Sequence, residues 1–145
     1  MSAGSRTNNN LQASMEAERL ATLGSYQIID TAPEEAFDRI TRLAADIFAA
    51  PVASISFVDQ DREWFKSVIG RTETHVDRPI SLSAAMVDHR EPLVFEDLSA
   101  EMRFERNPLL EGDSPLSFYA GAPLLASNGT VLGALWIADT APRGS

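Results

Sequence analysis

The stretch FYAGAPLLASNGTVLGALWIAD, residues 118–139, decides the fold. Two apolar runs flank Asn128-Gly129, which is a strong signal for a β-hairpin with a type I′ turn. Such a turn fixes the residue pairs that face each other across the hairpin: Gly121 with Trp136, Pro123 with Ala134, and Leu124 with Gly133. Glycine and proline weaken strands, so these positions need a structural reason. We expect the indole of Trp136 to lie over Gly121, and a bulge or an unpaired position at Pro123.

The two faces of the hairpin differ in character. One face collects aromatic and small residues, namely Tyr119, Gly121, Pro123, Leu125, Leu132, Ala134 and Trp136. The other face is more aliphatic: Phe118, Ala120, Ala122, Leu124, Val131, Leu135 and Ile137. Neither face is polar, so both are expected to be covered. We expect a helix on the aliphatic face, and the loops and short helices of residues 70–110 over the aromatic face, enclosing a cavity.

The N-terminal half supplies the helix. Residues 15–24 predict a first helix, and residues 33–49 predict a longer amphipathic one, with Thr31 to Glu34 spaced as a capping box. Its apolar stripe runs from Phe37 through Ile40 and Ala44 to Ile47, with Leu43 and Phe48 beside it, and is expected to pack on the sheet.

The pattern then changes to a period of two. It predicts strands over 52–59 and 64–69, a polar loop over 70–80, a short helix over 81–90, a strand over 93–96 and a short helix over 97–104. Strands joined by short turns indicate an antiparallel sheet, so the fold class is α+β. We expect a disordered tail over 1–14, one domain over 15–140 and the start of a linker over 141–145, in a piece of a longer protein.

Composition excludes several classes of function. The chain has 145 residues, a formal net charge of −9 and no cysteine. The acidic balance argues against nucleic acid and anionic membranes as partners, and we expect a cytoplasmic protein. The lack of cysteine excludes disulfides, thiolate metal sites, thiol redox chemistry and a thioether-linked chromophore.

Four segments together resemble a GAF domain of the bacterial signalling type. They are RLATLGSYQIIDTAPEEAFDRITRLAADIF (19–48), PVASISFVDQDREWFKSVIG (51–70), EPLVFEDLSAEMRFERNPLL (91–110) and FYAGAPLLASNGTVLGALWIAD (118–139). The resemblance implies a central antiparallel sheet with N-terminal helices on one face. It also implies a small-molecule pocket under loops and short helices on the other face, and an output domain elsewhere in the same chain.

Two functions follow from the resemblance. The first is a non-catalytic sensor that binds an unknown small molecule and relays its binding through flanking helices to the output domain. The alternative is a scaffold or dimerisation module with a filled pocket, which would form a homodimer through its terminal helices. A pocket of roughly 300–1,000 Å³ with polar groups in its wall would favour the sensor.

Catalysis and cofactor binding are weaker hypotheses. One branch of the family reduces free methionine sulfoxide with cysteines, which this chain lacks. A nucleophilic Ser83 needs an adjacent base, and His89, six residues away, is poorly placed on a helix. Haem would need His75 or His89 as its axial ligand; His75 is better explained as a solvated loop residue, and His89 as a helix-end residue bonded to the last carbonyls. We therefore expect no enzyme activity and no cofactor.

The predicted pocket face supplies the candidate ligand-binding residues. They are Ser54, Ser56, Trp64, Ser83, Phe104, Tyr119 and Trp136. Tyr119 and Trp136 offer π surfaces and polar tips, so we expect a small, partly aromatic or apolar ligand. Asp59, Asp61 and Glu63 resemble a metal cluster, but we interpret them as an exposed hairpin turn, because the rest of a calcium loop is missing.

Overall fold

A six-stranded antiparallel sheet forms the centre of the computed structural model, which describes residues 3–143, with side chains from residue 10 onward. The strand order is β3-β2-β1-β6-β5-β4. The strands are β1 (Val52–Val58), β2 (Arg62–Ile69), β3 (His75–Asp77), β4 (Leu93–Phe95), β5 (Phe118–Leu125) and β6 (Val131–Asp139). Every pairing is antiparallel, which confirms the predicted α+β class.

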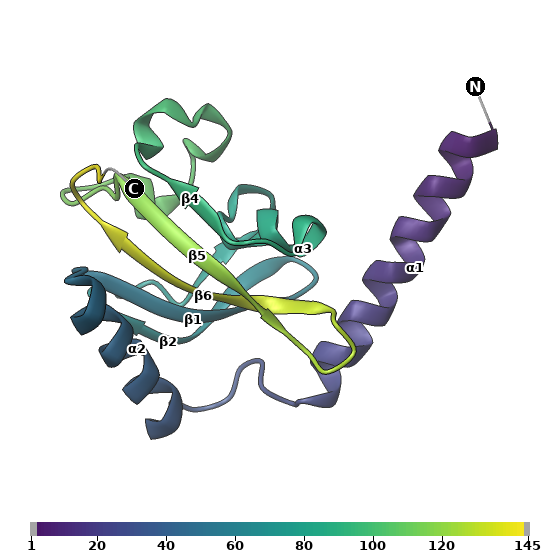
Figure 1. Ribbon diagram of the computed structural model, residues 1–145, viewed down its shortest axis with the longest axis horizontal. Coiled ribbons are helices and arrows are strands. Elements are labelled where there is room, and N and C mark those ends of the chain that lie inside the picture. Colours follow the sequence, from purple (N-terminus) through teal and green to yellow (C-terminus); the bar gives the residue numbers. More distant parts are fainter. Residues whose placement is uncertain (1–2, 144–145) are drawn as a thin grey trace.

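Helices cover the sheet on both sides. Helix α2 (Glu35–Phe48) lies on one face, and α3 (Met86–His89) lies on the other among the segments that surround β4 (Figure 1). Five single-turn 3₁₀ helices complete this second layer: η1 (Arg78–Ile80), η2 (Ser83–Ala85), η3 (Leu98–Ala100), η4 (Met102–Phe104) and η5 (Pro108–Leu110). The α2 packing confirms the layer arrangement expected from the sequence.

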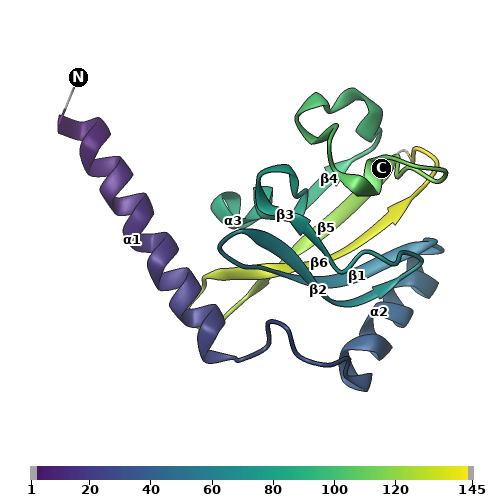
Figure 2. The same cartoon turned by 180° about the vertical axis from the view of Figure 1, so that it is seen from behind.

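Helix α1 (Ala3–Ser25) starts earlier than the predicted helix; its N-terminal part projects away from the body of the domain (Figures 1 and 2), whereas its C-terminal part packs on it through the buried Arg19 and Leu23. The tail expected over 1–14 is therefore helical from Ala3 onward. Extending an existing helix costs far less than nucleating one, so a polar segment can continue it. Residues 1–2, and 144–145 of the expected linker, lie outside the described residues.

The hairpin has the predicted register but a different turn. The pairs Gly121–Trp136, Pro123–Ala134 and Leu124–Gly133 are confirmed. Ala126 donates to the Thr130 carbonyl and Gly129 donates to the Ala126 carbonyl, so the loop has three residues. Gly129 has a φ of 85°, whereas Asn128 is not among the described residues with positive φ, so the type I′ prediction is wrong. A bulge between Leu124 and Leu125 absorbs the extra residue.

Each small residue of the hairpin has a reason. A Cβ at Gly133 would lie 2.7 Å from the Phe57 Cα and closer still to the Ser56 carbonyl oxygen, so the neighbouring β1 backbone requires glycine. A Cβ at Gly121 would lie 2.8 Å from both Met86 Cε and Tyr119 Oη. The residues over Gly121 are thus Met86 and Tyr119, rather than Trp136 as expected. Pro123 lies on β5 beyond the stretch paired with β4 and next to the bulge.

Helix α2 faces the sheet with its small residues. Thr41 and Ala44 are buried, and the Thr41 hydroxyl donates to the Phe37 carbonyl and contacts Ser67 Oγ at 2.8 Å. The larger apolar residues expected there are exposed: Ile40 by 48%, Leu43 by 57%, Ile47 by 66% and Phe48 by 55%. The prediction that this whole stripe is core is wrong, because the short side chains let the helix lie close to the sheet and turn the long ones outward.

The start of α2 also differs from the prediction. The helix begins after Glu34, whose side chain makes no capping hydrogen bond. The Thr31 hydroxyl donates instead to the Ile28 carbonyl and accepts from Lys66 Nζ. The expected capping box is therefore not formed.

A β-bulge changes the side-chain pattern of β2. Ile55 pairs with Ser67 and Ser56 pairs with Phe65, so Lys66 is an extra residue. Phe65 then packs with Val68 in the core between the sheet and the short helices, although the strict alternation predicted from sequence puts them on opposite faces. The predicted loop over 70–80 contains β3, which pairs with β2 from Arg62 to Trp64.

Candidate functional site

Four of the seven predicted ligand-binding residues meet around one buried carboxylate. Glu63, at the start of β2, is only 2% exposed. Its Oε2 accepts from Ser56 Oγ at 2.6 Å, Ser83 Oγ at 2.9 Å and Trp136 Nε1 at 3.0 Å. Its Oε1 accepts from Ser81 Oγ at 2.6 Å. The interpretation of Glu63 as part of an exposed turn is therefore wrong, since β2 begins at Arg62 and sends Glu63 inward.

Tyr119 extends this network. Its hydroxyl lies 2.6 Å from Ser83 Oγ, and its ring is 5.4 Å from the Trp136 ring. Burial raises the pKa of Tyr119 well above its usual value, and the charge of Glu63 raises it further. Tyr119 therefore stays protonated and donates to Ser83, which in turn donates to Glu63.

The other three predicted residues lie apart from the network. Phe104, on η4, is buried and packs edge-to-face on Phe95, with ring centroids 5.5 Å apart. The Ser54 hydroxyl is buried and has no hydrogen-bond partner among the described residues. Trp64 lies in the core on the α2 side of the sheet, with Ile55 and Phe57.

Side chains fill the space where the sequence predicts an internal cavity. The core between the sheet and the short helices is formed by large residues that are each less than 10% exposed: Phe65, Leu82, Met86, Leu98, Phe104, Leu109, Leu116, Tyr119 and Trp136. Together with the Glu63 network, they pack the aromatic face of the hairpin against residues 81–110. An open cavity has to be sought outside this core.

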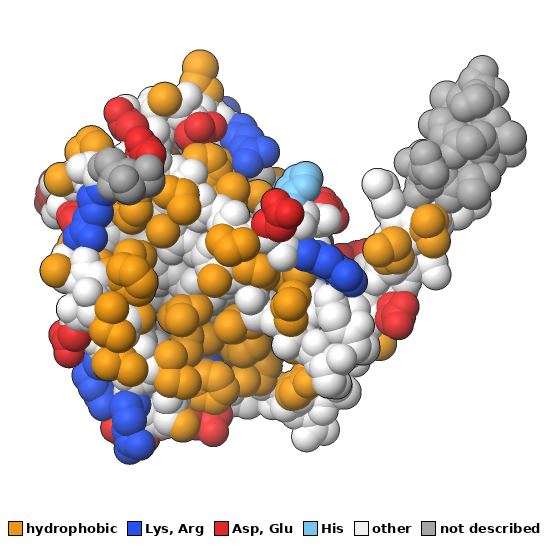
Figure 3. Space-filling view, in the orientation of Figure 1, with side chains coloured by type: hydrophobic (Ala, Val, Ile, Leu, Met, Phe, Trp, Pro, Cys, Tyr) orange, Lys and Arg blue, Asp and Glu red, His pale blue; other side chains and the backbone are white. Residues whose placement is uncertain are grey.

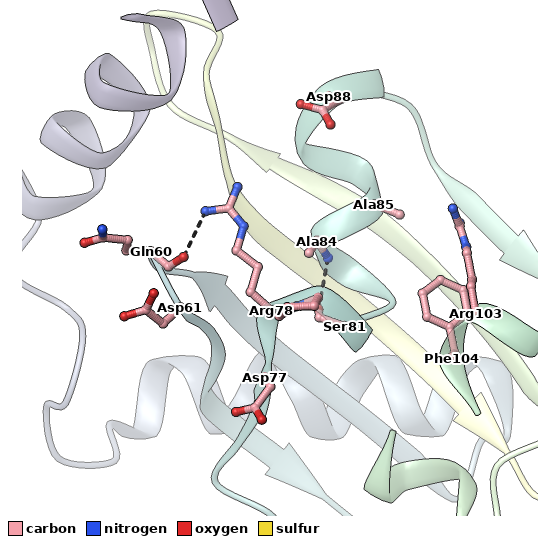
Figure 4. A pocket seen from close by; sticks show the side chains of 11 residues that line it. Gln60, Asp61, Asp77, Arg78, Ser81, Ala84, Ala85, Asp88, Arg103 and Phe104 are labelled. Atoms are coloured by element: carbon pink, nitrogen blue, oxygen red, sulfur yellow. Dashed lines mark hydrogen bonds between the residues drawn. The ribbon is translucent and has the colours of Figure 1, made fainter. Parts of the chain in front are cut away.

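A hollow of about 660 Å³ lies at the surface above the network (Figure 4). Its lining comes from the β1–β2 turn, the end of β3, the η1–η2 region, α3 and η4: Gln60, Asp61, Asp77, Arg78, Pro79, Ser81, Ala84, Ala85, Asp88, Arg103 and Phe104. Ser81 is shared with the network, because its Oγ donates to Glu63 and accepts from Ala84 N. The guanidinium of Arg103 lies 4.5 Å from the centre of the Phe104 ring, which forms a cation–π pair in the wall.

Ion pairs connect this hollow to α1. Arg78 Nη1 donates to Glu16 Oε2 at 2.7 Å, and Arg19 Nε donates to Glu16 Oε1 at 2.9 Å. Arg19 is 4% exposed and also donates to the carbonyls of Val58 and Val131, which fixes α1 to two central strands. Burial raises the pKa of Glu16, but hydrogen bonds from Arg19 and Arg78 outweigh it and lower the pKa to about 2.

The catalytic alternatives find little support in the geometry. Ser83 is buried and bonded to Glu63 and Tyr119, whereas His89 is exposed at the end of α3. Within residues 3–143, the acidic and histidine side chains form no group of three that could hold a metal ion. In the same part of the chain, no helix has the length and apolar character needed to cross a membrane.

Sequence reasoning missed the centre of the site. Extending the two-residue period of the β2 strand back from Phe65 would have placed Glu63 on the same face. Glu16 and Arg19 have the i,i+3 spacing of a helical ion pair, but no sequence signal connects them with Arg78, which is 62 residues from Glu16 and meets it only in the folded chain.

Comparisons with known proteins agree with this architecture. A cyclic di-GMP phosphodiesterase of Pseudomonas aeruginosa, PA2567, is 33% identical over 129 residues, which cover 89% of this chain and 22% of that protein. The chain thus spans about a fifth of the length of this curated relative.

Solved GAF domains have the same fold at low sequence identity. The GAF domain of a phosphoenolpyruvate-protein phosphotransferase from Acinetobacter has a TM-score of 0.64 and 20% identity, covering 90% of this chain and 81% of that one. The corresponding domain from Coxiella burnetii has a TM-score of 0.63 and 15% identity, covering 92% and 83%. The model of the GAF domain family matches residues 32–144, and the chain therefore belongs to this family.

Proposed function

We propose that the chain is a non-catalytic regulatory domain that binds a small molecule in the surface hollow. Binding alters the contacts of α1 and is relayed through this helix. The observation that carries this proposal is the position of Arg78. Its side chain lines the hollow and is ion-paired with Glu16 of α1 at 2.7 Å. A ligand that contacts Arg78 therefore competes with one of the contacts that hold the helix.

The lining indicates the chemistry of the ligand. The exposed guanidinium of Arg103 lies over the buried Phe104 ring and presents a planar cationic surface, on which a flat aromatic ring can stack. Asp61, Asp77 and Asp88 surround the opening and disfavour a polyanion. We propose a small, partly aromatic ligand with few negative charges. Of the predicted binding residues, Phe104 lines the hollow, and Ser83 supports it through the Glu63 network.

The relay needs two states of α1 that bind the ligand differently. In the observed state, Arg78 and Arg19 share the Glu16 carboxylate, and Arg19 ties α1 to β1 and β6. Withdrawing Arg78 toward a ligand weakens one side of this arrangement. At the other end of the domain, Arg143 donates to the carbonyls of Phe48 and Ala49, which ties the chain after β6 to the end of α2.

The regulated activity lies outside this domain. We propose that the chain acts within a longer cytoplasmic signalling protein that carries an output domain. The P. aeruginosa phosphodiesterase, of which the match covers 22%, supports this arrangement.

The experiment is a thermal-shift screen of metabolites, followed by a test of α1. Binding of a hit should be lost in Arg103→Ala and kept in Arg106→Ala, because Arg106 is a nearby exposed cation outside the hollow. The chain has no cysteine, so Leu11→Cys and Glu91→Cys can carry spin labels without background. The hit should change their separation in the parent and leave it unchanged in Arg78→Gln. Two results would contradict the proposal: a hit that binds Arg103→Ala as well as the parent, or a spin-label separation that does not change when the hit binds.

A second candidate function is dimerisation without a ligand, and the exposed face of α2 favours it. Ile40, Leu43 and Ile47 form an apolar stripe on this helix. Arg39 and Asp46 border the stripe seven residues apart, so a second α2 running antiparallel brings each Arg39 near Asp46 of the other copy. Figure 3 shows hydrophobic side chains gathered on the face that carries β5 and β6. We propose a second copy of the chain as the occupant of this stripe.

Sedimentation analysis distinguishes this candidate. The parent should form a dimer, and Leu43→Glu should make it monomeric. Met102→Glu is the matched control, since Met102 is 76% exposed and lies on η4, away from α2. A monomeric parent, or a dimer that survives Leu43→Glu, would exclude the α2 interface.

A further inference from the structure

The Glu63 carboxylate lies in an environment that resembles a binding site. Its four donors come from separate parts of the chain: Ser56 from β1, Ser81 and Ser83 from the η1–η2 region, and Trp136 from β6. All four donors are uncharged. A carboxylate accepts about four hydrogen bonds, so the group is fully satisfied although it is 2% exposed.

The donor set is directional. Trp136 Nε1 can only donate, so it requires an acceptor at this place. Ser83 receives a hydrogen bond from Tyr119, which leaves its own proton free for Glu63. Chains of hydrogen bonds of this kind polarise one another and strengthen the final contact. The arrangement therefore favours an acceptor-only group over one that must also donate.

The buried cations of the domain are engaged elsewhere. Lys66 Nζ donates to Thr31 and to the Ala32 carbonyl and pairs with Glu34, while Arg19 binds backbone carbonyls and Glu16. Within the described chain, no ion pair joins Glu63 to a basic side chain. Neutral dipoles alone hold the carboxylate, as they would in a site built to receive a small acid.

We propose that this cluster is a carboxylate-binding site that the chain fills with its own Glu63, and that it takes a free small carboxylate when the Glu63 side chain is removed. The proposal does not rest on the function proposed for the hollow. Glu63→Ala removes a CH₂–COO⁻ group, whose free equivalent is acetate. Ser81 both donates to Glu63 and lines the surface hollow, so its side chain lies between the site and the hollow.

Thermal melting of Glu63→Ala in acetate, chloride and acetamide at matched ionic strength tests the proposal. The variant should melt below the parent in chloride, and acetate should raise its Tm by about the same step for each tenfold increase above half-saturation. Acetamide, which has the same shape without the charge, should have little effect. The near-ultraviolet circular dichroism of the two tryptophans, of which Trp136 contacts Glu63, should return toward that of the parent only in acetate.

Two further variants serve as controls. Glu63→Gln fills the same space, so neither it nor the parent should respond to acetate. Adding Ser83→Ala to Glu63→Ala removes one donor and should weaken the acetate response.

Several outcomes would overturn the proposal. They are a folded Glu63→Ala protein without an acetate response, an equal response to acetamide, and a response of Glu63→Gln that matches that of Glu63→Ala. If Glu63→Ala does not fold in chloride, it should refold in acetate. Failure to refold in either solution also counts against a site that accepts a free carboxylate.

Discussion

Replacing Gly133 by alanine should destabilise the domain through the sheet backbone. The added Cβ would lie 2.7 Å from Phe57 Cα and would also collide with the Ser56 carbonyl oxygen. Both obstacles are main-chain atoms of β1, which pairs with β6 along its length, so no side-chain rotation relieves them. Overpacking commonly costs about 1–3 kcal/mol, and we expect the upper part of this range. For a domain of this size, that corresponds to a Tm lowered by about 5–10 °C.

Gly24→Ala is the matched control for this change. Gly24 lies in α1, and a Cβ there would meet no atom within 4 Å. Alanine is favoured over glycine in a helix by about 1 kcal/mol, so this variant should melt at or above the parent temperature. Both variants are measured by calorimetry and by urea unfolding monitored through tryptophan fluorescence. A Gly133→Ala protein that melts with the parent would refute the close approach of β1 and β6 described above.

Three further predictions concern the site and the helix attached to it. Gly121→Val should lower the Tm by more than a typical surface change, because Met86 and Tyr119 lie within 3 Å of the added Cβ; equal stability would show that both move freely. In Tyr26→Phe, which leaves Tyr119 as the single tyrosine, tyrosinate absorbance should appear only as the protein unfolds in alkali, because burial and the charge of Glu63 raise the pKa of Tyr119. The stabilisation of the folded state by the protonated Tyr119 is fully present below the pKa of the unfolded tyrosine and is lost as the pH rises above it. Ionisation of Tyr119 in the folded protein would contradict this prediction. Glu16, with its pKa lowered from 4.5 to about 2, should stabilise the parent over Glu16→Gln above pH 4.5, by no more than about 1 kcal/mol because it is partly exposed. Urea unfolding at a series of pH values measures this difference in the free energy of unfolding, which should vanish as the pH falls toward 2. A difference that does not change with pH would argue against the ion pairs of Glu16 with Arg19 and Arg78.

The local patterns of the sequence determined every strand of the sheet except β3, and the order of these strands along the chain. Alternation over 52–58 and 118–139, together with the turn residues between the arms, was enough to predict the antiparallel strands and the Gly121–Trp136 register. These features depend on neighbours in the chain, and a two-residue period translates directly into the two faces of a strand. The same alternation correctly placed Tyr119 and Trp136 on one face, opposite α2.

The two β-bulges and the hairpin loop, each of which contains one residue more than the regular pattern, were not predictable from the alternation. The bulge at Lys66 and the bulge beside Leu125 each break the period, and a three-residue loop replaced the predicted type I′ turn. A bulge changes which face every later side chain occupies, while leaving the composition of the strand unchanged.

The tertiary structure alone decided which apolar and charged groups are buried. The stripe of α2 has the helical period of a core face, yet Thr41 and Ala44 contact the sheet and Ile47 is exposed, because the distance between helix and sheet selects the short side chains. Glu63 has the composition of a turn residue, but three serines and a tryptophan from distant segments provide the hydrogen bonds that allow its burial. Such compensation exists only after the chain has folded, and for this reason the sequence by itself indicated a pocket where the structure has a filled network.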